Sequence, residues 1–427
     1  MTVARIGVLG AGTMGAGIAQ VAALGGYETR LYDAFPAAAE RGAAQLGEAL
    51  RKGAARGRWS EAEAEAAAAR VSAVAELEEL AGCELLIEAA PEEVELKRQL
   101  FTAAAAACDS ETVLATNTSS LRVSDIAAGV PGPERVVGMH FFNPPALMKL
   151  VEVVAAAESS EAALAATTAV AERMGRTPIR ARDTPGFVAN RLARPFNLEA
   201  LRMLADGVAE PEAIDRAYRL GGGFRMGPFE LIDLIGLDVN LAIARSFFAQ
   251  GGEPERWRPS PIQERMVGEG RLGRKSGRGF YEYDEAGKPH STAPYDRIAG
   301  KTRSGPGEPG SAPPAGPMLD SAELAAIDPA AEEILLRLFS QIANEAAFAL
   351  EEGIASPGDM DTATRLGLNW PLGSLELAGL IGAERALAIL ERLGAESGGA
   401  YGPAPLLLRA AERGEELAAV APQESGR

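Results

Sequence analysis

Short apolar runs alternate with longer stretches rich in alanine and charged residues over the first 183 residues of the chain. The runs have the length of buried strands, and the stretches between them have the spacing and length of helices. This alternation is typical of βαβ units, so we predict a mainly parallel sheet with helices on both faces. The predicted strands are residues 6–9, 29–32, 84–87, 112–115, 136–139, 150–155 and 177–182, with helices that include 37–55 and 93–107.

The pattern changes near residue 184. From 184 to 283 the apolar residues recur at helical spacing between Gly and Pro interruptions, which indicates an all-α domain. Residues 284–320 have little apolar pattern and much Pro, Gly and Ser, which is typical of a linker. Helical spacing resumes at 321. We therefore predict an α/β domain over 1–183, a helical domain over 184–283, a linker over 284–320 and a second helical domain over 321–427.

The second helical domain repeats part of the first. When the chain is shifted by 146 residues, residues 199–236 align without gaps on residues 345–382. Two Ala- and Leu-rich segments that match by composition alone do not share Gly, Pro and Asp at the same turn positions. We therefore interpret the segment as a duplicated helical unit. The matched positions include Gly207/Gly353, Pro211/Pro357, Asp215/Asp361, Gly227/Gly373, Glu230/Glu376 and Gly236/Gly382.

Composition narrows the class of protein. The chain has 427 residues, of which 47% are hydrophobic and 24% charged, so we expect a soluble protein with a large core. A net charge of −17 argues against nucleic acid or an anionic membrane as a partner. Two cysteines, Cys83 and Cys108, provide no disulfide framework, and no signal peptide or membrane span is evident, so we expect a cytoplasmic location. Two histidines, His140 and His290, exclude a His-rich metal site, and we expect no metal.

A glycine-rich loop follows the first predicted strand and leads into a helix. Gly10 permits a tight turn, Gly12 lets the backbone approach a pyrophosphate, and Gly15 allows close packing of the helix on the strand. The helix N-terminus adds free N–H groups and a positive dipole end. Within a Rossmann-type domain, the phosphate-binding residues that we expect are Gly10, Ala11, Gly12, Thr13, Met14 and Gly15.

Asp33 ends the second predicted strand, 23 residues after Gly10. In dinucleotide-binding domains an acidic residue about 20 residues after the glycines accepts hydrogen bonds from the ribose hydroxyls. The same carboxylate repels a 2′-phosphate, so the sequence predicts NAD rather than NADP as the cofactor.

A polar loop and a lone histidine follow two predicted strands. Ser119 lies in the loop after strand 112–115, His140 follows strand 136–139, and Glu152 lies in the next strand. Ligands bind at the carboxyl ends of strands in such sheets, and a carboxylate fixes the tautomer of a catalytic histidine. The residues alone leave two interpretations open: a catalytic His140–Glu152 pair, or a buried histidine that caps a loop beside an exposed Glu152.

Five ordered motifs resemble the L-3-hydroxyacyl-CoA dehydrogenase family. The resemblance covers residues 3 to about 283, and the repeat extends it to about 395. It implies a Rossmann-type domain followed by a helical domain that forms much of the substrate cleft. The motifs are Asn-Thr-Ser-Ser at 117–120, His-Phe-Phe-Asn-Pro at 140–144, Met-Lys-Leu-Val-Glu-Val at 148–153, Asp-Thr-Pro-Gly-Phe-Val-Ala-Asn-Arg at 183–191 and Gly-Arg-Gly-Phe-Tyr at 277–281.

The resemblance assigns roles to four residues. It implies that His140 is the base that takes the proton of the substrate's 3-hydroxyl group while hydride leaves C3 for NAD. It implies that Glu152 holds the imidazole and stabilises its positive charge. Ser119 and Asn190 match the polar groups that hydrogen-bond the oxygen atoms of the substrate, which would be a 3-hydroxyacyl-CoA thioester.

Further matches concern the cofactor. Glu92 and Lys97 resemble the NAD-contacting pair of the family, although residues of these types also begin many surface helices. The other positions that the resemblance assigns to NAD are Ser119, Asn143 and Lys275.

Binding of CoA by an acidic chain requires local positive charge. Arg56 falls where the family often has a CoA-contacting lysine, within a basic cluster that also contains Arg51, Lys52 and Arg58. A guanidinium has a different geometry from an ammonium, so the cluster also fits a solvated helix end. Ser119 is the other residue that we expect to contact the CoA substrate.

The second repeat has no matching catalytic group, because Asn190 corresponds to Leu336 and no His follows His290. We interpret it as structural, either as an internal pseudo-dimer partner or within a homo-oligomer. Two other functions stay open: a β-hydroxyacid or sugar-acid dehydrogenase on the same architecture, and a non-catalytic NAD-binding structural protein.

Overall fold

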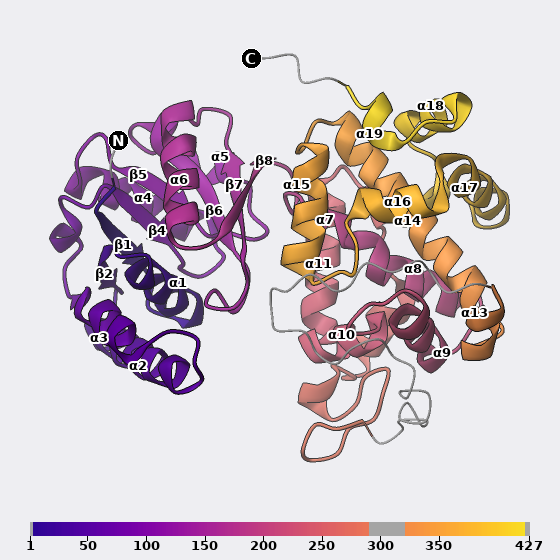
Figure 1. The fold of residues 1–427 in the computed structure, drawn as a ribbon, viewed down its shortest axis with the longest axis horizontal. Coiled ribbons are helices and arrows are strands. Elements are labelled where there is room, and N and C mark those ends of the chain that lie inside the picture. Colours follow the sequence, from indigo (N-terminus) through magenta and orange to yellow (C-terminus); the bar gives the residue numbers. More distant parts are fainter. Residues whose placement is uncertain (1–2, 290–320, 423–427) are drawn as a thin grey trace. The chain divides into compact units, whose positions relative to one another are not determined.

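The computed structural model describes residues 3–289 and 321–422. Its internal contacts divide the chain into two compact units, Met1–Phe187 and Val188–Arg427, which are drawn in Figure 1 and are described separately here. Both helical repeats belong to the second unit. Most of the predicted linker, including His290, lies outside the described residues.

An eight-stranded sheet forms the centre of the first unit, counted over residues that the structure describes. The strand order is β3-β2-β1-β4-β5-β6-β7-β8, and only β6 and β7 pair in antiparallel fashion. The order reverses between β1 and β4, and sheets of this kind bind ligands at the carboxyl ends of the strands at such a point. The strands are β1 (Arg5–Leu9), β2 (Glu28–Tyr32), β3 (Val71–Val74), β4 (Leu85–Glu88), β5 (Val113–Thr116), β6 (Val136–Phe141), β7 (Leu150–Ala155) and β8 (Thr177–Arg182).

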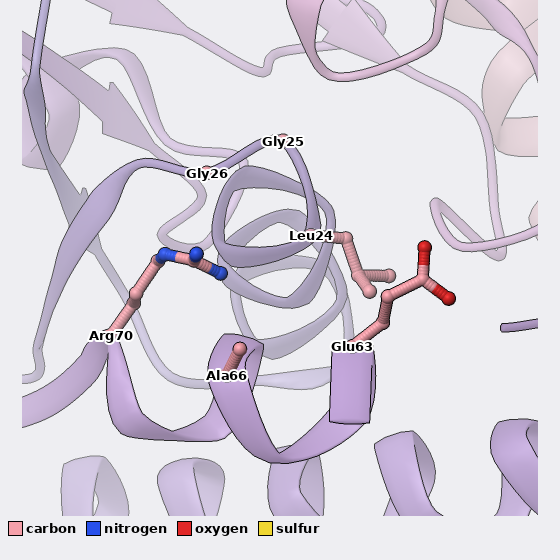
Figure 2. A pocket seen from close by; sticks show the side chains of 6 residues that line it. All are labelled: Leu24, Gly25, Gly26, Glu63, Ala66 and Arg70. Atoms are coloured by element: carbon pink, nitrogen blue, oxygen red, sulfur yellow. The ribbon is translucent and has the colours of Figure 1, made fainter. Parts of the chain in front are cut away.

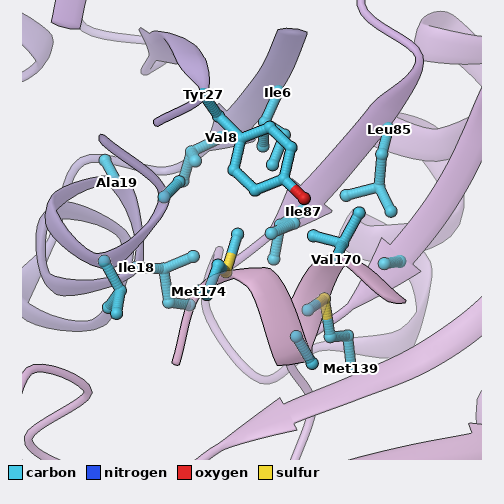
Figure 3. Packing of buried hydrophobic residues seen from close by; sticks show 14 of the residues in the cluster. Ile6, Val8, Ile18, Ala19, Tyr27, Leu85, Ile87, Met139, Val170 and Met174 are labelled. Atoms are coloured by element: carbon cyan, nitrogen blue, oxygen red, sulfur yellow. The ribbon is translucent and has the colours of Figure 1, made fainter. Parts of the chain in front are cut away.

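Two helices pack on one face of this sheet through a shared apolar core. Ile18 of α1 and Val170 of α6 lie against Ile6, Val8 and Ile87 of the central strands (Figure 3). These side chains alternate along each strand, as expected for one face of a sheet. The helices of the unit are α1 (Thr13–Leu24), α2 (Pro36–Ala55), α3 (Glu61–Ala69), α4 (Val94–Ala107), α5 (Val123–Ala127) and α6 (Glu161–Arg173).

All seven predicted strands are confirmed to within two residues at their ends, as are the two helices that were predicted by range. The strand β3 was not predicted. It is a short edge strand in which Ser72 and Ala73 are exposed, so it has no run of apolar residues to mark it. The predicted architecture, a Rossmann-type domain followed by repeated helical segments, is confirmed.

Helices make up most of the second unit. In the first repeat the elements are α7 (Ala189–Leu192), α8 (Arg194–Ala205), α9 (Pro211–Arg216), the π-helical turn η3 (Ala217–Gly221), α10 (Pro228–Ile235), α11 (Leu237–Gln250) and α12 (Pro261–Gly268). The later elements are α13 (Ser321–Ile327), α14 (Ala331–Glu351), α15 (Pro357–Thr362), the π-helical turn η8 (Ala363–Gly367), α16 (Ser374–Ile381), α17 (Ala383–Ser397), α18 (Pro405–Arg413) and α19 (Leu417–Val420).

The turn residues shared by the repeats have the same structural role in both. The carboxylate of Asp215 accepts hydrogen bonds from the first-turn N–H groups of Phe229 and Glu230 in α10, at 2.9 and 3.0 Å. Asp361 accepts the corresponding bond from Leu375 in α16, at 2.7 Å. A Cβ atom at the matched Gly227 would lie 2.3 Å from Cγ of the capping aspartate. Each repeat therefore needs its Asp and Gly to form the same capped helix start.

Reciprocal ion pairs of two buried arginines join the two repeats. Arg191 and Arg337 occupy equivalent positions under the 146-residue shift, and so do the acidic residues that they contact. A pattern in which each copy contacts the same groups on the other is what a two-fold symmetric interface produces. The ion pairs are Arg191–Glu345 at 2.8 Å, Arg191–Glu352 at 2.6 Å, Arg337–Glu199 at 2.6 Å and Arg337–Asp206 at 2.9 Å.

Candidate active site

His140 and Glu152 form a buried hydrogen-bonded pair. They lie directly opposite each other in the antiparallel pairing of β6 with β7, which brings the two side chains to the same face of the sheet. Nδ1 of His140 lies 2.6 Å from Oε2 of Glu152. The histidine is 5% exposed and the glutamate is fully buried, so the interpretation with an exposed Glu152 does not fit the structure.

The carboxylate determines which ring nitrogen of His140 is available for chemistry. A carboxylate only accepts hydrogen bonds, so Nδ1 is the donor to Glu152, and in the neutral imidazole Nε2 is the nitrogen with the lone pair. The aromatic rings of Phe142 and Phe187 lie 4.6 and 5.8 Å from the imidazole, measured between ring centroids. The imidazole is thus held by one strong hydrogen bond and by apolar neighbours, with Nε2 free to take a proton from a ligand.

The loop after β5 is organised by Glu92. One oxygen, Oε1, accepts hydrogen bonds from the Thr118 hydroxyl at 2.7 Å and from the backbone N–H groups of Ser119 and Ser120, both at 2.9 Å. Burial raises the pKa of Glu92, but Lys97 and these donors outweigh burial and hold the pKa below its ordinary value. Ser119 itself is exposed at the carboxyl end of β5, and its hydroxyl makes only a long 3.5 Å contact with Oε1 of Glu92.

A buried charge network lies beneath this loop. Nζ of Lys97 contacts Oε1 of Glu88 at 2.7 Å and Oε2 of Glu92 at 3.3 Å, and the lysine side chain is 1% exposed. Oε2 of Glu88 accepts a 2.6 Å bond from the hydroxyl of Thr116. Glu92 and Lys97, predicted as a cofactor-contacting pair, are thus bonded to each other, and the buried Lys97 reaches the loop through Glu92.

Two residues of this region were missed by sequence reasoning. Glu88 ends the apolar strand β4, so the pattern gave no sign that its carboxylate holds Lys97. Asn117 was treated only as part of a motif, yet its Oδ1 accepts the N–H of Phe141 at 2.8 Å and links the ends of β5 and β6. A polar residue at the carboxyl end of a buried strand was the available signal for both.

The glycine-rich loop has the conformation that phosphate binding requires. Gly10 has φ +103°, and a Cβ atom at Gly15 would lie 1.8 Å from the carbonyl oxygen of Gly10, so neither position tolerates a side chain. A Cβ atom at Gly12 would meet no described atom within 4 Å, so this face of the loop is open to a ligand. Helix α1 begins directly after Gly12 at Thr13, and its first-turn N–H groups lack intrahelical partners.

Asp33 lies beside this loop. Its Oδ2 accepts the N–H of Ala11 at 2.9 Å, and its Oδ1 accepts the N–H of Phe35 at 3.0 Å. The carboxylate is therefore fixed at the carboxyl ends of β1 and β2, next to the glycines. The loop after β6 comes to the same region, because Pro145 packs on Gly17 of α1. That contact holds the exposed Asn143 near the first turns of α1.

The other predicted site residues lie elsewhere. Arg56 and Arg58 are exposed at the end of α2, and neither has a salt bridge among the described residues. Asn190 in α7 belongs to the second unit. So does Lys275, whose Nζ lies 2.5 Å from Oδ1 of Asp238 at the start of α11.

One hollow of the first unit lies away from these residues. It has a volume of about 240 Å³ and is lined by Leu24, Gly25, Gly26, Glu63, Ala66 and Arg70 (Figure 2). The Gly25–Gly26 turn precedes β2, so the hollow lies at the amino ends of the parallel strands. Ligands of such sheets bind at the opposite edge, where His140 and the glycine-rich loop lie. No helix among the described residues is long and apolar enough to cross a lipid bilayer.

Two family models match nearly the whole described chain. The model for the NAD-binding domain of 3-hydroxyacyl-CoA dehydrogenase matches residues 5–184, and the model for the C-terminal domain matches both 186–283 and 334–418. The chain is 36% identical to 3-hydroxyadipyl-CoA dehydrogenase of Escherichia coli K12, over 92% of this chain and 94% of that protein. It is 43% identical to a probable 3-hydroxybutyryl-CoA dehydrogenase of Bacillus subtilis, over 67% of this chain and 99% of that protein.

Solved structures give the same result. A crystal structure of 3-hydroxybutyryl-CoA dehydrogenase from Escherichia coli K12 matches with a TM-score of 0.83 and 35% identity, covering 97% of this chain and 99% of that one. A crystal structure of (S)-3-hydroxybutyryl-CoA dehydrogenase from Ralstonia eutropha matches with a TM-score of 0.64 and 36% identity, covering 66% of this chain and 100% of that one.

Proposed function

The chain belongs to the 3-hydroxyacyl-CoA dehydrogenase family of NAD-dependent oxidoreductases, and from that membership we propose that His140 and Glu152 carry out its proton transfer. The reaction oxidises an (S)-3-hydroxyacyl-CoA to a 3-ketoacyl-CoA and reverses. The observation that supports the proposed roles is the buried 2.6 Å contact between Nδ1 of His140 and Glu152, which leaves Nε2 as the acceptor.

In the proposed oxidation, one proton and one hydride leave the substrate. Nε2 of His140 takes the proton of the 3-hydroxyl group as the C3–H bond breaks, and the electron pair of the O–H bond becomes the second bond of the C3 carbonyl. The bound NAD supplies a two-electron acceptor for the hydride that leaves C3. The imidazolium that results is stabilised by the Glu152 carboxylate, and in the reverse direction it returns the proton to the carbonyl oxygen.

The residues present fit NAD. The open face at Gly12 and the first turn of α1 suit a pyrophosphate, and Asp33 is held where a ribose would follow. We propose that Asn143 and the Ser119 loop with Glu92 contact the nicotinamide half. In this proposal Lys97 affects NAD binding by holding Glu92 in place. Lys275, in the second unit, is a further proposed NAD contact. Ser119 and Asn190 would hydrogen-bond the substrate oxygens.

We expect Asp33 to set the choice of cofactor. A carboxylate at the ribose repels a 2′-phosphate, so kcat/KM should be higher with NAD than with NADP. Asp33→Ser should reduce the ratio of kcat/KM with NAD to kcat/KM with NADP, because serine carries no charge. Serine can still accept a hydrogen bond from the Ala11 N–H. Steady-state kinetics with both cofactors measures the ratio. A wild-type preference for NADP, or a ratio that Asp33→Ser leaves unchanged, would reject this role.

Arg56 and Arg58 are the basic residues that we propose for CoA. Both are exposed on the end of α2, which suits contact with the phosphates of a flexible ligand. The double variant Arg56→Glu/Arg58→Glu should raise KM for an acyl-CoA and spare KM for NAD. The matched control is Arg413→Glu, an exposed arginine at the end of α18 that also has no salt bridge among the described residues. No change in KM for acyl-CoA, or an equal change for NAD, would contradict the assignment.

The reaction itself is tested in the reductive direction. NADH absorbance is followed with acetoacetyl-CoA, with longer 3-ketoacyl-CoA thioesters and with a dicarboxylic thioester in parallel. We expect NADH to be consumed with at least one thioester. Consumption with free 3-keto acids alone would instead favour a β-hydroxyacid dehydrogenase, and no consumption with any substrate would favour a non-catalytic NAD-binding protein.

We also propose that the second repeat is an internal pseudo-dimer partner. The reciprocal pairs of Arg191 and Arg337 support this role, because each repeat binds the other through the same positions. A cytoplasmic location fits Cys83 and Cys108, which are both free thiols in the structure.

A further inference from the structure

Arg194 is a buried cation without an anionic partner. It begins α8 in the second unit and is 7% exposed, and its Cζ lies 4.6 Å from the ring centroid of Phe247. Its Nε donates to the carbonyl oxygen of Asn190 at 3.1 Å. Among the described residues no carboxylate lies within ion-pair distance, and Nη1 and Nη2 have no hydrogen-bond acceptor. Burying an unpaired charge is costly, and neither Nη atom is among the fully enclosed atoms that lack a partner, so water or an anionic ligand can reach the guanidinium.

The acidic groups near Arg194 are already engaged by other cations. Glu345 accepts from Nε of Arg191 at 2.8 Å and from Nε of Arg256 at 3.0 Å. The second carboxylate of the group, on Glu352, binds the two Nη atoms of Arg191. Glu345, the carboxylate whose charge acts on Arg194, is therefore already hydrogen-bonded to two other guanidinium groups. Burial lowers the pKa of Arg194 to about 10, and Glu345 opposes that shift only in part.

The second repeat shows which residue types this helical position accepts when no ligand is bound there by the proposed function. Under the 146-residue shift, Arg194 corresponds to Ser340 and Asn190 corresponds to Leu336. Ser340 is fully buried and its hydroxyl donates to the carbonyl oxygen of Leu336 at 2.7 Å, which is the bond that Arg194 makes in the first repeat. A small neutral residue therefore satisfies this helical position. The first repeat differs by having an amide and a guanidinium together, one helical turn apart.

This inference rests on the proposed function, in which Asn190 contacts the substrate. We propose that Arg194 binds the terminal carboxylate of a dicarboxylic 3-hydroxyacyl-CoA and selects that class over thioesters with an apolar end. A planar guanidinium with two free Nη groups matches a carboxylate in a bidentate fork. The ligand would provide the counter-charge that the protein lacks at this position.

The dimensions fit a short diacid. The terminal carboxyl carbon of a six-carbon diacid lies three C–C bonds beyond C3, which is about 4 Å in an extended chain. Residues four apart on a helix are neighbours on one face, about 6 Å apart along the axis. Because Nε of Arg194 reaches back to the carbonyl of Asn190, the guanidinium lies on the Asn190 side of that interval. A substrate held at C3 by Asn190 therefore has its carboxylate within reach of Arg194.

The test compares two substrates of equal length, 3-hydroxyadipyl-CoA and 3-hydroxyhexanoyl-CoA, in wild type and Arg194→Met. Methionine keeps the apolar contact with Phe247 and removes the charge. We expect kcat/KM for the adipyl thioester to fall about 10- to 100-fold, the range for a hydrogen-bonded charge, and kcat/KM for the hexanoyl thioester to change less than about twofold. The matched control is Arg245→Met, which removes an exposed arginine of α11 and should affect neither substrate.

The outcomes separate this inference from the proposed function. If wild type oxidises neither thioester, the proposed function fails and this inference fails with it. If wild type oxidises both and Arg194→Met lowers both equally or neither, only the role of Arg194 is overturned. Competitive inhibition of wild type by adipyl-CoA and hexanoyl-CoA tests the inference without any variant. We expect adipyl-CoA to inhibit at about 10- to 100-fold lower concentration, and equal inhibition would contradict the proposal.

Discussion

His140→Gln should lower turnover of an (S)-3-hydroxyacyl-CoA about 10²- to 10⁴-fold, the contribution typical of a positioned general base. Glutamine cannot accept the proton that Nε2 of histidine takes, but its amide still donates to the buried Glu152. The carboxylate is therefore not left without a partner, and the fold should be retained. Because the glycine-rich loop and Asp33 lie on other strands, the affinity for NADH should not change.

The measurement pairs turnover with cofactor binding. NADH formation gives kcat, fluorescence titration gives the dissociation constant of NADH, and thermal unfolding checks the fold. Glu152→Gln is the informative companion, because it keeps an acceptor for Nδ1 and removes the charge that stabilises the imidazolium. We expect a smaller loss for Glu152→Gln than for His140→Gln. A folded His140→Gln protein with turnover near that of wild type would refute the assignment of the base.

Glu345→Ala should lower the free energy of unfolding by about 3–5 kcal/mol, the cost of removing one partner from a buried ion pair. The Glu345 side chain is 3% exposed and receives Arg191 at 2.8 Å, Arg256 at 3.0 Å and Nε1 of Trp257 at 2.9 Å. Arg256 and Trp257 would lose their acceptor on Glu345, and Arg191 would keep only Glu352. The first repeat would thereby lose its contacts with Glu345 of α14, while the pairs of Arg337 with Glu199 and Asp206 would remain.

Urea unfolding followed by the fluorescence of Trp257 and Trp370, both in the second unit, measures this effect. The control is Glu333→Ala in the same helix. Because Arg392, the partner of Glu333, is exposed, this variant should lower the free energy of unfolding by about 1 kcal/mol or less. If Glu345→Ala is no more destabilising than Glu333→Ala, the cross-repeat pairs do not hold the unit together. The ion pairs between the repeats would then not account for the proposed internal pseudo-dimer.

Periodicity predicted the strands that contain apolar runs and missed the short edge strand β3. The central strands carry continuous apolar runs because helices cover the sheet, so each run was visible in the sequence. Strand β3 pairs only with β2 at the sheet edge and has two exposed residues, so nothing in its composition distinguished it from the end of α3. The repeat was visible because Asp215 and Gly227 recur as Asp361 and Gly373, at positions where only those residue types form the capped turn.

Sequence motifs predicted the candidate catalytic residues. They did not predict which charged side chains are buried in the fold or which partners those side chains have. His140 and Glu152 were identified as a possible pair because a lone histidine follows one predicted strand and a carboxylate lies in the next. The antiparallel pairing of β6 with β7, which places them opposite each other, was not predicted. Spacing could not show that Lys97 is buried between Glu88 and Glu92, since both contacts depend on how β4 and α4 pack. For the same reason, Arg194 was indistinguishable from any other helical arginine until its lack of a carboxylate partner was seen in the fold.

The central claim is that this chain moves a proton through His140 and a hydride to NAD on a CoA thioester. The most direct measurement follows NADH absorbance with an (S)-3-hydroxyacyl-CoA and with the corresponding free 3-hydroxy acid, for wild type and His140→Gln side by side. We predict NADH formation by wild type with the thioester, little with the free acid, and almost none by His140→Gln with either. Comparable oxidation of the free acid, or undiminished oxidation of the thioester by His140→Gln, would contradict the claim.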